Sequence, residues 1–522
     1  CGSCFHPYLC RCRTGMVIFM KRRTVAFLMA VLLLAGCLFS CTGDQQSSRS
    51  EGGSSDGSAV APESTTSLML NHLGERNLDG FELVILSTTE EVPFGDIQFA
   101  TDELNSDPVN DAVFERNNLI EELYNCKISV KYCAEGEDFC TRVTTDCLSG
   151  TVDYHVLASG ISTTGLAKLA ADGLLYDLYA LEDSHLRLDS EWWDQQALKQ
   201  LSIDNKLYFA CGDVVITDDE QTSMLFFNRD LIDEYSLEDP YQLVRDGKWT
   251  MDKMYEMCKT VAHDGGDGVM NIEGEEDYWG LIGAAFDCYK FILGGNAAMV
   301  TKDADDLPVI SVTDQHNIDV FQKVYEFMTD RSRVAYWEQY YRWDDYDNGQ
   351  KLYDQFYAGR VLFFANIIAT MNGPQMLDST IRYGVLPLPK YNEEQQDYCC
   401  TINPYKFTCL SLPRDTFVDV EKSTFLLEAL AYYNWNEVTS LYYNTTLKSK
   451  RLLDESSEEM LDIIFSNKII DLANIFNWDD CIQYYNQMIM GAGNAVVSFM
   501  ESRESRMQAG IDQTIELFRK LN

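Results

Sequence analysis

The stretch DYHVLASGISTTGLAKLAADGLLYDL (153–178) joins two patterns that together indicate an α/β fold. Residues 153–160 are a mostly apolar run that ends in Ser159 and Gly160, which is typical of a strand buried on both faces of a parallel sheet. The next segment, 164–178, repeats apolar residues at helical spacing: Leu166, Leu169, Ala170 and Leu174. A buried strand followed by an amphipathic helix is the repeating unit of parallel α/β proteins.

The same alternation runs through much of the 522-residue chain, whose length suggests more than one unit. The further predicted strands are FELVILSTT (81–89), KISVKY (127–132), SMLFFN (223–228), VLFFANI (361–367) and YGVLPLP (383–389). The further predicted helices are 111–125, a helix capped by Thr250, 424–434, and the region 458–522. The fold class expected from this order is α/β.

The charge balance excludes some classes of partner. Asp and Glu number 82 against 41 Lys and Arg, so the formal net charge is −41. A surface this acidic repels phosphate backbones and anionic lipid, so we expect no nucleic-acid binding. Apolar residues make up 46% of the chain and aromatic residues 12%, which is enough to build hydrophobic cores.

The first 79 residues have the pattern of an exported lipoprotein. Residues 1–19 hold four cysteines, and we interpret them as an upstream extension, with a zinc site as the alternative. Residues 20–36 combine a basic start with a 12-residue apolar run, too short to span a membrane and typical of a signal peptide. Leu34-Ala35-Gly36-Cys37 resembles a bacterial lipobox, so we expect Cys37 to be lipidated, with Cys41 as the alternative. Residues 37–79 are then a flexible Ser/Gly-rich tether.

Six segments of the chain between residues 80 and 522 carry a family resemblance. They are NDAVFERNNLIEELYNCKISV (110–130), DYHVLASGISTTGLAKLAADGLLYDLYAL (153–181), KLYFACGDVVITDDEQTSMLFFNRDLIDEY (206–235), GKWTMDKMYEMCKTV (247–261), YDQFYAGRVLFFAN (353–366) and YGVLPLPKY (383–391). In these segments the chain resembles the bacterial extracellular solute-binding proteins of ABC importers, of the carbohydrate type (family 1). Each motif alone is weak, but the six occur in the family's order behind a lipobox.

This resemblance implies a two-lobed periplasmic-binding-protein-like (type II) fold with a hinge and an interlobe cleft. The expected first lobe comprises 80–214 and 400–450, and the second 215–399 and 451–522. The chain should cross between the lobes near 211–219, 400–413 and 448–454. Ligands of open α/β sheets bind at the carboxyl ends of the strands, which agrees with a site between the lobes.

The implied function is capture of a solute, expected to be a mono- or oligosaccharide, and its delivery to an ABC transporter permease. We expect a monomer that needs no cofactor and is held by its lipid on the extracellular face of the bacterial cytoplasmic membrane. A peptide or another polar solute is the alternative ligand. No G-x-S-x-G, H-E-x-x-H or P-loop motif occurs, so we expect no catalysis. An exported glycan-acting enzyme with paired carboxylates stays open as an alternative.

Candidate ligand-binding residues follow predicted strands, lie on the first crossing, or offer aromatic faces to a sugar ring. The alternative for each is a solvated loop or core packing. The candidates are Thr88, Thr89 and Glu91; Ser159; Asp213 and Asp218; Trp279, Tyr289, Tyr442 and Tyr443; and Asn366. Further aromatic residues considered for the cleft are Trp192, Trp193 and Trp435.

Two further sequence patterns concern a metal site and disulfide bonds. The acidic, Gly-rich loop 263–277 matches a calcium loop poorly, because Gly265 stands at the third ligand position and no Glu at the twelfth, so we expect no metal there. Eleven cysteines lie beyond Cys41, an odd number that forbids full pairing. We expect mostly buried free thiols, with a Cys400–Cys409 bridge as an alternative.

Overall fold

The computed structural model describes residues 73–88, 99–101, 103–134, 137–162, 165–273, 276–341, 346–443, 454–493 and 495–521. These residues belong to one compact unit, Leu68–Asn522. The expected extension, signal peptide, lipidated cysteine (Cys37 or Cys41) and most of the tether therefore lie outside the described residues, as do Thr89 and Glu91. Within the described part of the chain, no helix combines the length and apolar character that a membrane crossing requires.

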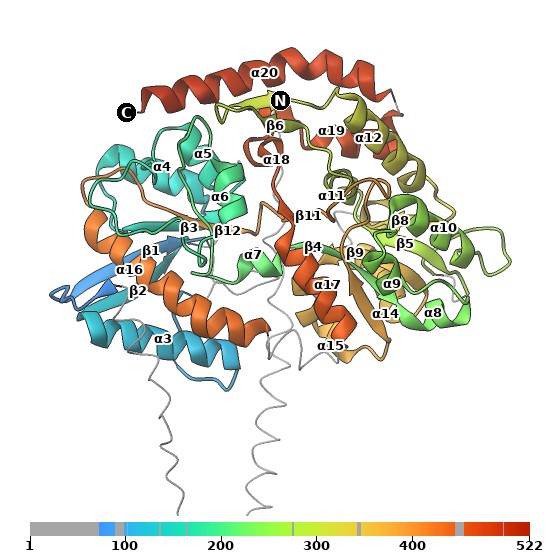
Figure 1. Ribbon diagram of the computed structural model, residues 1–522, viewed down its shortest axis with the longest axis horizontal. Helices are drawn as coiled ribbons and strands as arrows, with labels where there is room; N and C mark the ends of the chain where they lie inside the picture. The colour runs from blue at the N-terminus through green and yellow to red at the C-terminus, as the bar shows by residue number, and fades with distance from the viewer. Residues whose placement is uncertain are drawn as a thin grey trace, which may run out of the picture. The chain divides into compact units, whose positions relative to one another are not determined.

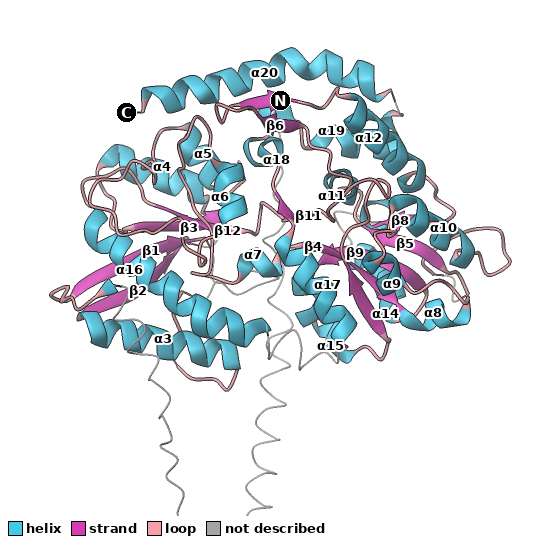
Figure 2. Cartoon of the chain, in the orientation of Figure 1, coloured by secondary structure: helices cyan, strands magenta, loops and turns pink. Residues whose placement is uncertain are grey.

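The first lobe is built on a four-stranded sheet in the order β12-β3-β1-β2 (Figures 1 and 2). Three strands are parallel and the edge strand β12 runs antiparallel to β3. The bounds are β1 (Phe81–Ser87), β2 (Cys126–Tyr132), β3 (Val156–Gly160) and β12 (Thr408–Ser411). Helices α3 (Pro108–Tyr124) and α16 (Val420–Tyr433) pack against each other beside this sheet. Helix α3 begins where the Asp107 side chain accepts hydrogen bonds from the first free N–H groups and ends at Asn125 in the left-handed conformation.

The second lobe is built on a five-stranded sheet in the order β10-β4-β9-β5-β8. Its strands are β4 (Ser223–Asn228), β5 (Trp279–Gly283), β8 (Val334–Tyr336), β9 (Val361–Ile367) and β10 (Tyr383–Leu386). All six residues of β4 are buried, because β9 and β10 flank it and helices cover its faces. Helix α10 (Met251–Val261) packs on β5 and starts at Thr250, whose side chain accepts from the Lys253 N–H as the sequence predicted.

The other elements fill the two lobes and the region between them. They are α4 (Phe139–Ser149), α5 (Leu166–Ala171), α6 (Gln195–Leu201), α7 (Thr217–Glu220), α8 (Arg229–Glu234), α9 (Pro240–Arg245), α11 (Asp287–Gly294), β6 (Val300–Lys302), β7 (Pro308–Ile310), α12 (Gln315–Met328), α13 (Trp337–Tyr340), α14 (Tyr346–Tyr357), η1 (Ile368–Asn372), α15 (Pro374–Asp378), β11 (Cys400–Thr401), η2 (Asn434–Thr439), α17 (Glu455–Ser466), β13 (Lys468–Ile469), α18 (Leu472–Phe476), η4 (Trp478–Asp480), α19 (Gln483–Gln487), η5 (Met488–Ala492) and α20 (Val496–Lys520).

The chain passes between the two sheets more than once. It leaves the first lobe after 211, forms α7, and enters β4 of the second sheet. It returns between β10 and β12, and after α16 and η2 it reaches α17, which packs on β10 and α9 of the second lobe. The last helix, α20, contacts α5 of the first lobe and α12 of the second, and Figure 1 shows it running along the top of both. The two-lobed α/β fold expected from the sequence is therefore confirmed.

Some local predictions differ from the structure. The helix predicted over 164–178 ends at Ala171, because Gly173 adopts a positive φ of 75° that turns the chain. The region 458–522 is not wholly helical, since it contains the short strand β13, which pairs with β11 from outside the region. Cys400 and Cys409 do not share a hairpin: β11 pairs with β13, whereas β12 pairs with β3. The eleven cysteines among the described residues are all free thiols.

Candidate functional site: a pocket between the lobes

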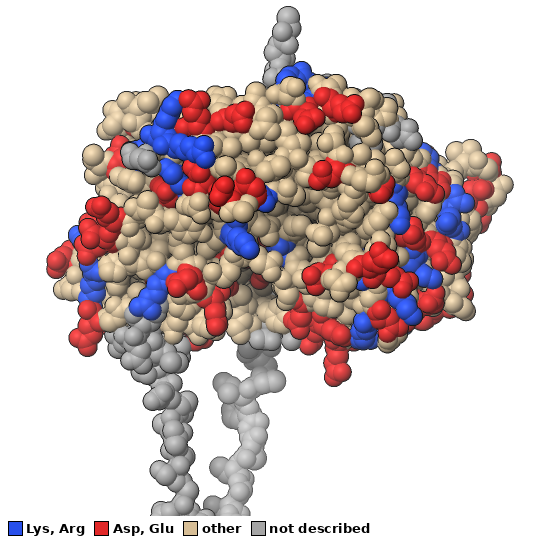
Figure 3. Space-filling model, turned by 45° about the horizontal axis from the view of Figure 1, so that its top comes forward, with Lys and Arg blue, Asp and Glu red and all other residues tan. Residues whose placement is uncertain are grey.

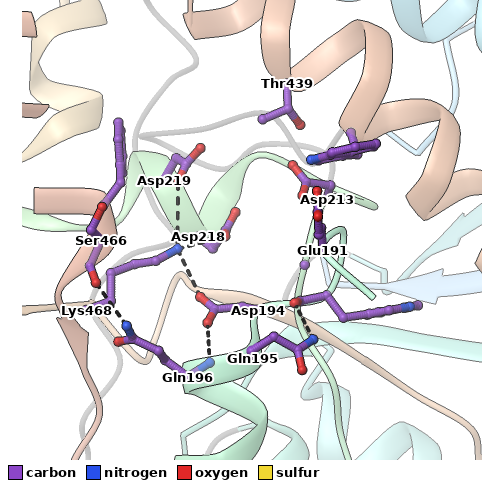
Figure 4. A pocket seen from close by; sticks show the side chains of 14 residues that line it. Glu191, Asp194, Gln195, Gln196, Asp213, Asp218, Asp219, Thr439, Ser466 and Lys468 are labelled. Atoms are coloured by element: carbon purple, nitrogen blue, oxygen red, sulfur yellow. Dashed lines mark hydrogen bonds and ion pairs between the residues drawn. The ribbon is translucent and has the colours of Figure 1, made fainter. Parts of the chain in front are cut away.

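A pocket of about 370 Å³ lies where the two lobes meet. Its first-lobe wall comes from the start of α6 and from η2, and its second-lobe wall from the end of α17. Gly212, Asp213, Asp218 and Asp219 of the segment 211–219 and Lys468 of β13 complete the lining. Figure 4 labels ten of its lining residues: Glu191, Asp194, Gln195, Gln196, Asp213, Asp218, Asp219, Thr439, Ser466 and Lys468. The pocket is the size of a small-molecule site.

Two backbone segments hold the carboxylates of one wall in place. The N–H of Asp213 donates to the carbonyl of Trp192 at 2.9 Å, and the N–H of Asp194 donates to that of Cys211 at 3.0 Å. The approach is possible because residue 212 is glycine: a Cβ there would lie 2.3 Å from the carbonyl oxygen of Trp192. This pairing puts the side chains of Asp194 and Asp213 on the same pocket wall.

Lys468 is the cation of the pocket. Its Nζ lies 3.0 Å from Asp194 Oδ2, 3.0 Å from Asp218 Oδ2 and 3.7 Å from Asp219 Oδ1. These carboxylates come from the start of α6 and from α7, and Figure 4 shows them converging on the ammonium group. Asp194 also caps α6, because its Oδ1 accepts from the N–H groups of Gln196 and Ala197. One charge network thus joins three segments far apart in the sequence.

The pKa values of these groups are perturbed in opposite directions. Burial opposes the charge of Lys468, but Asp218, Asp194 and Asp219 outweigh it and raise the Lys468 pKa well above its usual value. Burial also opposes ionisation of Asp194, yet Lys468 and the α6 N–H groups lower its pKa. Burial, and then the charge of Asp218, raise the pKa of Asp213 to about 7. The same two causes raise the pKa of Asp219 well above its usual value.

Aromatic side chains stand beside these carboxylates. Trp435 on η2 is partly buried, with its ring centroid 5.9 Å from that of Trp192 and 6.3 Å from that of Tyr432. Phe465, near the end of α17, lines the pocket from the other lobe. A site that combines hydrogen-bond acceptors with aromatic faces suits a ligand with polar edges and an apolar face, as a sugar ring has.

The structure brings together only part of the set of residues predicted from the sequence. Asp213 and Asp218 line the pocket, as do Trp193 and Trp435 among the further aromatic residues considered. Thr88 directly follows β1, and its carbonyl accepts from the Cys133 N–H. Ser159 is 2% exposed inside β3. Neither Thr88 nor Ser159 lines the pocket.

The remaining candidates lie elsewhere in the second lobe or beside the pocket. Trp279 and Tyr289 are 2% and 1% exposed in the core, and the Tyr289 hydroxyl donates to Asp471 at 2.6 Å, so neither ring offers a face to a ligand. The side-chain oxygen of Asn366, at the end of β9, accepts from the next N–H. Tyr442 is buried, and the Tyr443 ring centroid lies 6.0 Å from that of the pocket residue Phe465.

Several pocket residues were not predicted from the sequence: Glu191, Asp194, Gln195, Gln196, Thr439, Phe465, Ser466 and Lys468. Asp194 had a usable signal, because it follows the Trp192-Trp193 pair and precedes a helix as a capping residue. Lys468 had none, since its contact with Asp218 spans 250 residues of sequence.

The acidic loop 263–277 uses its carboxylates for its own backbone. Asp264 accepts from the N–H groups of Gly266 and Gly268, and Asp277 accepts from those of Gly265 and Asn271. Across the described residues, no three His, Cys, Asp or Glu side chains are grouped so as to hold a metal ion. Over the face drawn in Figure 3, acidic side chains are widely spread with basic ones between them.

Several solved structures have a fold similar to that of this chain. At 13% identity and a TM-score of 0.53, the chain matches UspC of Mycobacterium tuberculosis, covering 82% of this chain and 100% of that one. At 13% identity and 0.52 it matches UgpB of the same organism in complex with glycerophosphocholine, over 84% and 99%. At 12% identity and 0.50 it matches an ABC transporter solute-binding protein from Agrobacterium radiobacter in complex with ribitol, over 83% and 100%.

The chain has the fold of the ABC solute-binding proteins. The resemblance stated from the sequence is confirmed at the level of this solute-binding fold, and at these identities the matches show the fold alone. No protein-family model matches the chain, and no curated protein sequence does either.

Proposed function

We propose that this chain is the substrate-binding component of an ABC importer, which captures a small polar solute between its lobes and presents it to the permease. The observation that carries the proposal is the pocket itself. Its walls come from α6 and η2 on one lobe, α17 on the other, and the 211–219 segment between them. A ligand held there touches both lobes, so its binding free energy favours their closure.

The solute class that fits best is a mono- or oligosaccharide. The pocket offers the carboxylates of Asp213 and Asp218 as acceptors for hydroxyl groups and the partly buried ring of Trp435 as an apolar face. We propose that the protein acts outside the cell, held at the membrane by a lipid on Cys37 or Cys41. Mass spectrometry of the mature N-terminus tests the anchor separately from the ligand.

A thermal-shift screen of the purified chain against monosaccharides, oligosaccharides and polyols tests the proposed function. A ligand that binds the folded state raises the melting temperature with concentration, and it is recovered unchanged. Substitution Trp435→Ala should then weaken binding of the hit at least about tenfold, or ~1.4 kcal/mol. The matched substitution Tyr179→Ala, at an aromatic residue 48% exposed outside the pocket, should leave the affinity unchanged. A screen without any stabilising solute contradicts the proposal.

One observation favours a second candidate, a glycan-acting enzyme. Two carboxylates of one pocket have pKa values pushed apart, with that of Asp213 raised and that of Asp194 lowered, as in an acid and base pair. Chromatography of the oligosaccharide after incubation separates the two functions. Cleavage products that disappear in Asp213→Asn would assign catalysis, whereas an intact ligand supports the binding protein.

A further inference from the structure

Cys211 and Cys409 occupy facing positions on two antiparallel segments of the first lobe. Ala210 and Leu410 exchange both of their backbone hydrogen bonds, at 2.9 and 2.8 Å. They are therefore a hydrogen-bonded pair, and the next pair along, Cys211 with Cys409, is a non-hydrogen-bonded pair. In such pairs the Cα atoms approach to about 4.5 Å and the side chains point to the same face. A disulfide needs Cα atoms about 4.4–6.8 Å apart, so the Cα separation typical of such a pair permits a disulfide.

Both cysteines are buried at this pair, 2% and 0% exposed, so neither thiol faces solvent. The two side chains are near enough for each to perturb the pKa of the other. Other buried thiols of the described chain have backbone partners instead: Cys140 donates to the Gly165 carbonyl and Cys481 to that of Ala473. Cys211 and Cys409 instead have each other as neighbours across the backbone pairing.

We propose that Cys211 and Cys409 are a disulfide-forming pair that closes when the chain meets a disulfide oxidant. The two thiols lose two protons and two electrons and form one S–S bond, while the oxidant's disulfide is cleaved and leaves as two thiols. Sequence spacing suggests Cys400 as a partner of Cys409, but the sheet register places Cys211 opposite Cys409 instead.

Burial decides when the bond forms. It raises the pKa of both thiols, so few thiolates exist in the folded protein, and exchange requires a thiolate. The bond should therefore form as the chain folds and then resist reductants that stay in solvent. The consequence for the pocket is direct, because Gly212 and Asp213 follow Cys211 in the chain. A bond to β12 fixes the first-lobe end of the 211–219 segment and leaves the residues after it to act as the hinge.

Peptide mapping after refolding tests the pair. The full chain is unfolded in urea with reductant, refolded in a mixture of reduced and oxidised glutathione, alkylated with iodoacetamide and digested with trypsin. Cleavage after Lys206, Arg229, Lys406 and Arg414 yields fragments 207–229 and 407–414, which contain Cys211 and Cys409 as their only cysteines. The expected result is a cross-linked species of these two fragments, lighter by two hydrogen atoms than their sum and lost after dithiothreitol.

Two variants and a stability measurement complete the test. Cys258→Ser, at a buried thiol of the second lobe, should keep the cross-link, and Cys409→Ser should abolish it. The oxidised wild type should unfold at higher urea than the reduced form, and Cys409→Ser should lose that difference. Alkylation of both fragments in the refolded wild type, or a cross-link from either to another cysteine, would overturn the proposal. This inference does not rest on the proposed function, since the mapping needs no ligand.

Discussion

At the scale of single residues, Lys468 shows how the pocket depends on long-range contacts. It stands on a two-residue strand and has a side chain only 12% exposed, with three aspartates within 4 Å. Without the cation these carboxylates would repel one another in a largely buried setting. Lys468 therefore holds together the segments that build the pocket.

The substitution Lys468→Met tests this role. Removing one partner of a buried ion pair leaves uncompensated charge, and we expect a loss of about 3 kcal/mol in the free energy of unfolding. Lys253→Met is the matched control, because Lys253 pairs at 2.8 Å with the exposed Glu238, and it should cost less than ~1 kcal/mol. Urea denaturation measures both. Equal losses in the free energy of unfolding for the two variants would contradict the role of Lys468 in holding the pocket segments together.

The raised pKa of Asp213 gives a prediction on pH. The folded-state pKa of about 7 lies above the unfolded value of about 3.9, so the folded form keeps a proton that the unfolded form has released. Stability contributed at low pH is then lost as pH rises from about 4 to 7. The side chain at position 213 cannot ionise in Asp213→Asn. Between about pH 4 and 7 the free energy of unfolding of this variant should therefore fall by roughly 2–4 kcal/mol less than that of the wild type. The comparison uses the urea midpoints of both proteins at about pH 4.5 and about pH 8. An equal change in midpoint for the two proteins would refute a raised pKa at Asp213.

At the scale of elements, helix α16 orients the Trp pair at the pocket wall. Glu428 on α16 is fully buried and accepts from the indole N–H groups of Trp192, at 2.9 Å, and Trp193, at 3.0 Å. Its Oε2 also accepts from the Arg187 backbone N–H at 3.0 Å. The helix thereby fixes the segment that leads into Asp194.

Removing this acceptor should cost both stability and pocket geometry. Glu428→Ala removes the carboxylate that accepts from two buried indole N–H groups, and we expect a loss of about 3 kcal/mol in the free energy of unfolding, since loss of a buried hydrogen-bond partner costs ~1–3 kcal/mol. Glu421→Ala on the same helix removes only surface contacts, with Arg76 and His185, and should cost under ~1 kcal/mol. Thermal or urea unfolding distinguishes them. If the Glu428→Ala protein is as stable as the Glu421→Ala protein, Glu428 does not stabilise the Trp192-Trp193 segment.

The elements were more predictable from the sequence than the site. Strands β1, β4 and β9 are mostly apolar runs, and this burial on both faces leaves a clear local signal. Asp213 and Asp218 were predictable because they lie on the segment between the lobes. Trp279 could not be told from a cleft residue, since an aromatic side chain has the same local pattern in a core as in a binding site.

At the scale of the whole molecule, two lobes share a pocket and are also joined by α20. The Phe518 ring near its end packs 4.4 Å from the ring of Tyr208 in the first lobe, and its Phe499 contacts Tyr484 at 5.4 Å at the other end. Helix α20 therefore links the two lobes. We expect closure to be a rotation about the 211–219 segment and the neighbouring passages.

Calorimetric titration of the full chain with the best solute from the screen tests the central claim most directly. We predict saturable binding of one solute per chain, weakened at least about tenfold, or ~1.4 kcal/mol, by Trp435→Ala and unchanged by Tyr179→Ala. Circular dichroism confirms that each variant is folded. Binding that Trp435→Ala leaves at the wild-type affinity, or no binding of any solute that the screen offers, would contradict a solute site in this pocket.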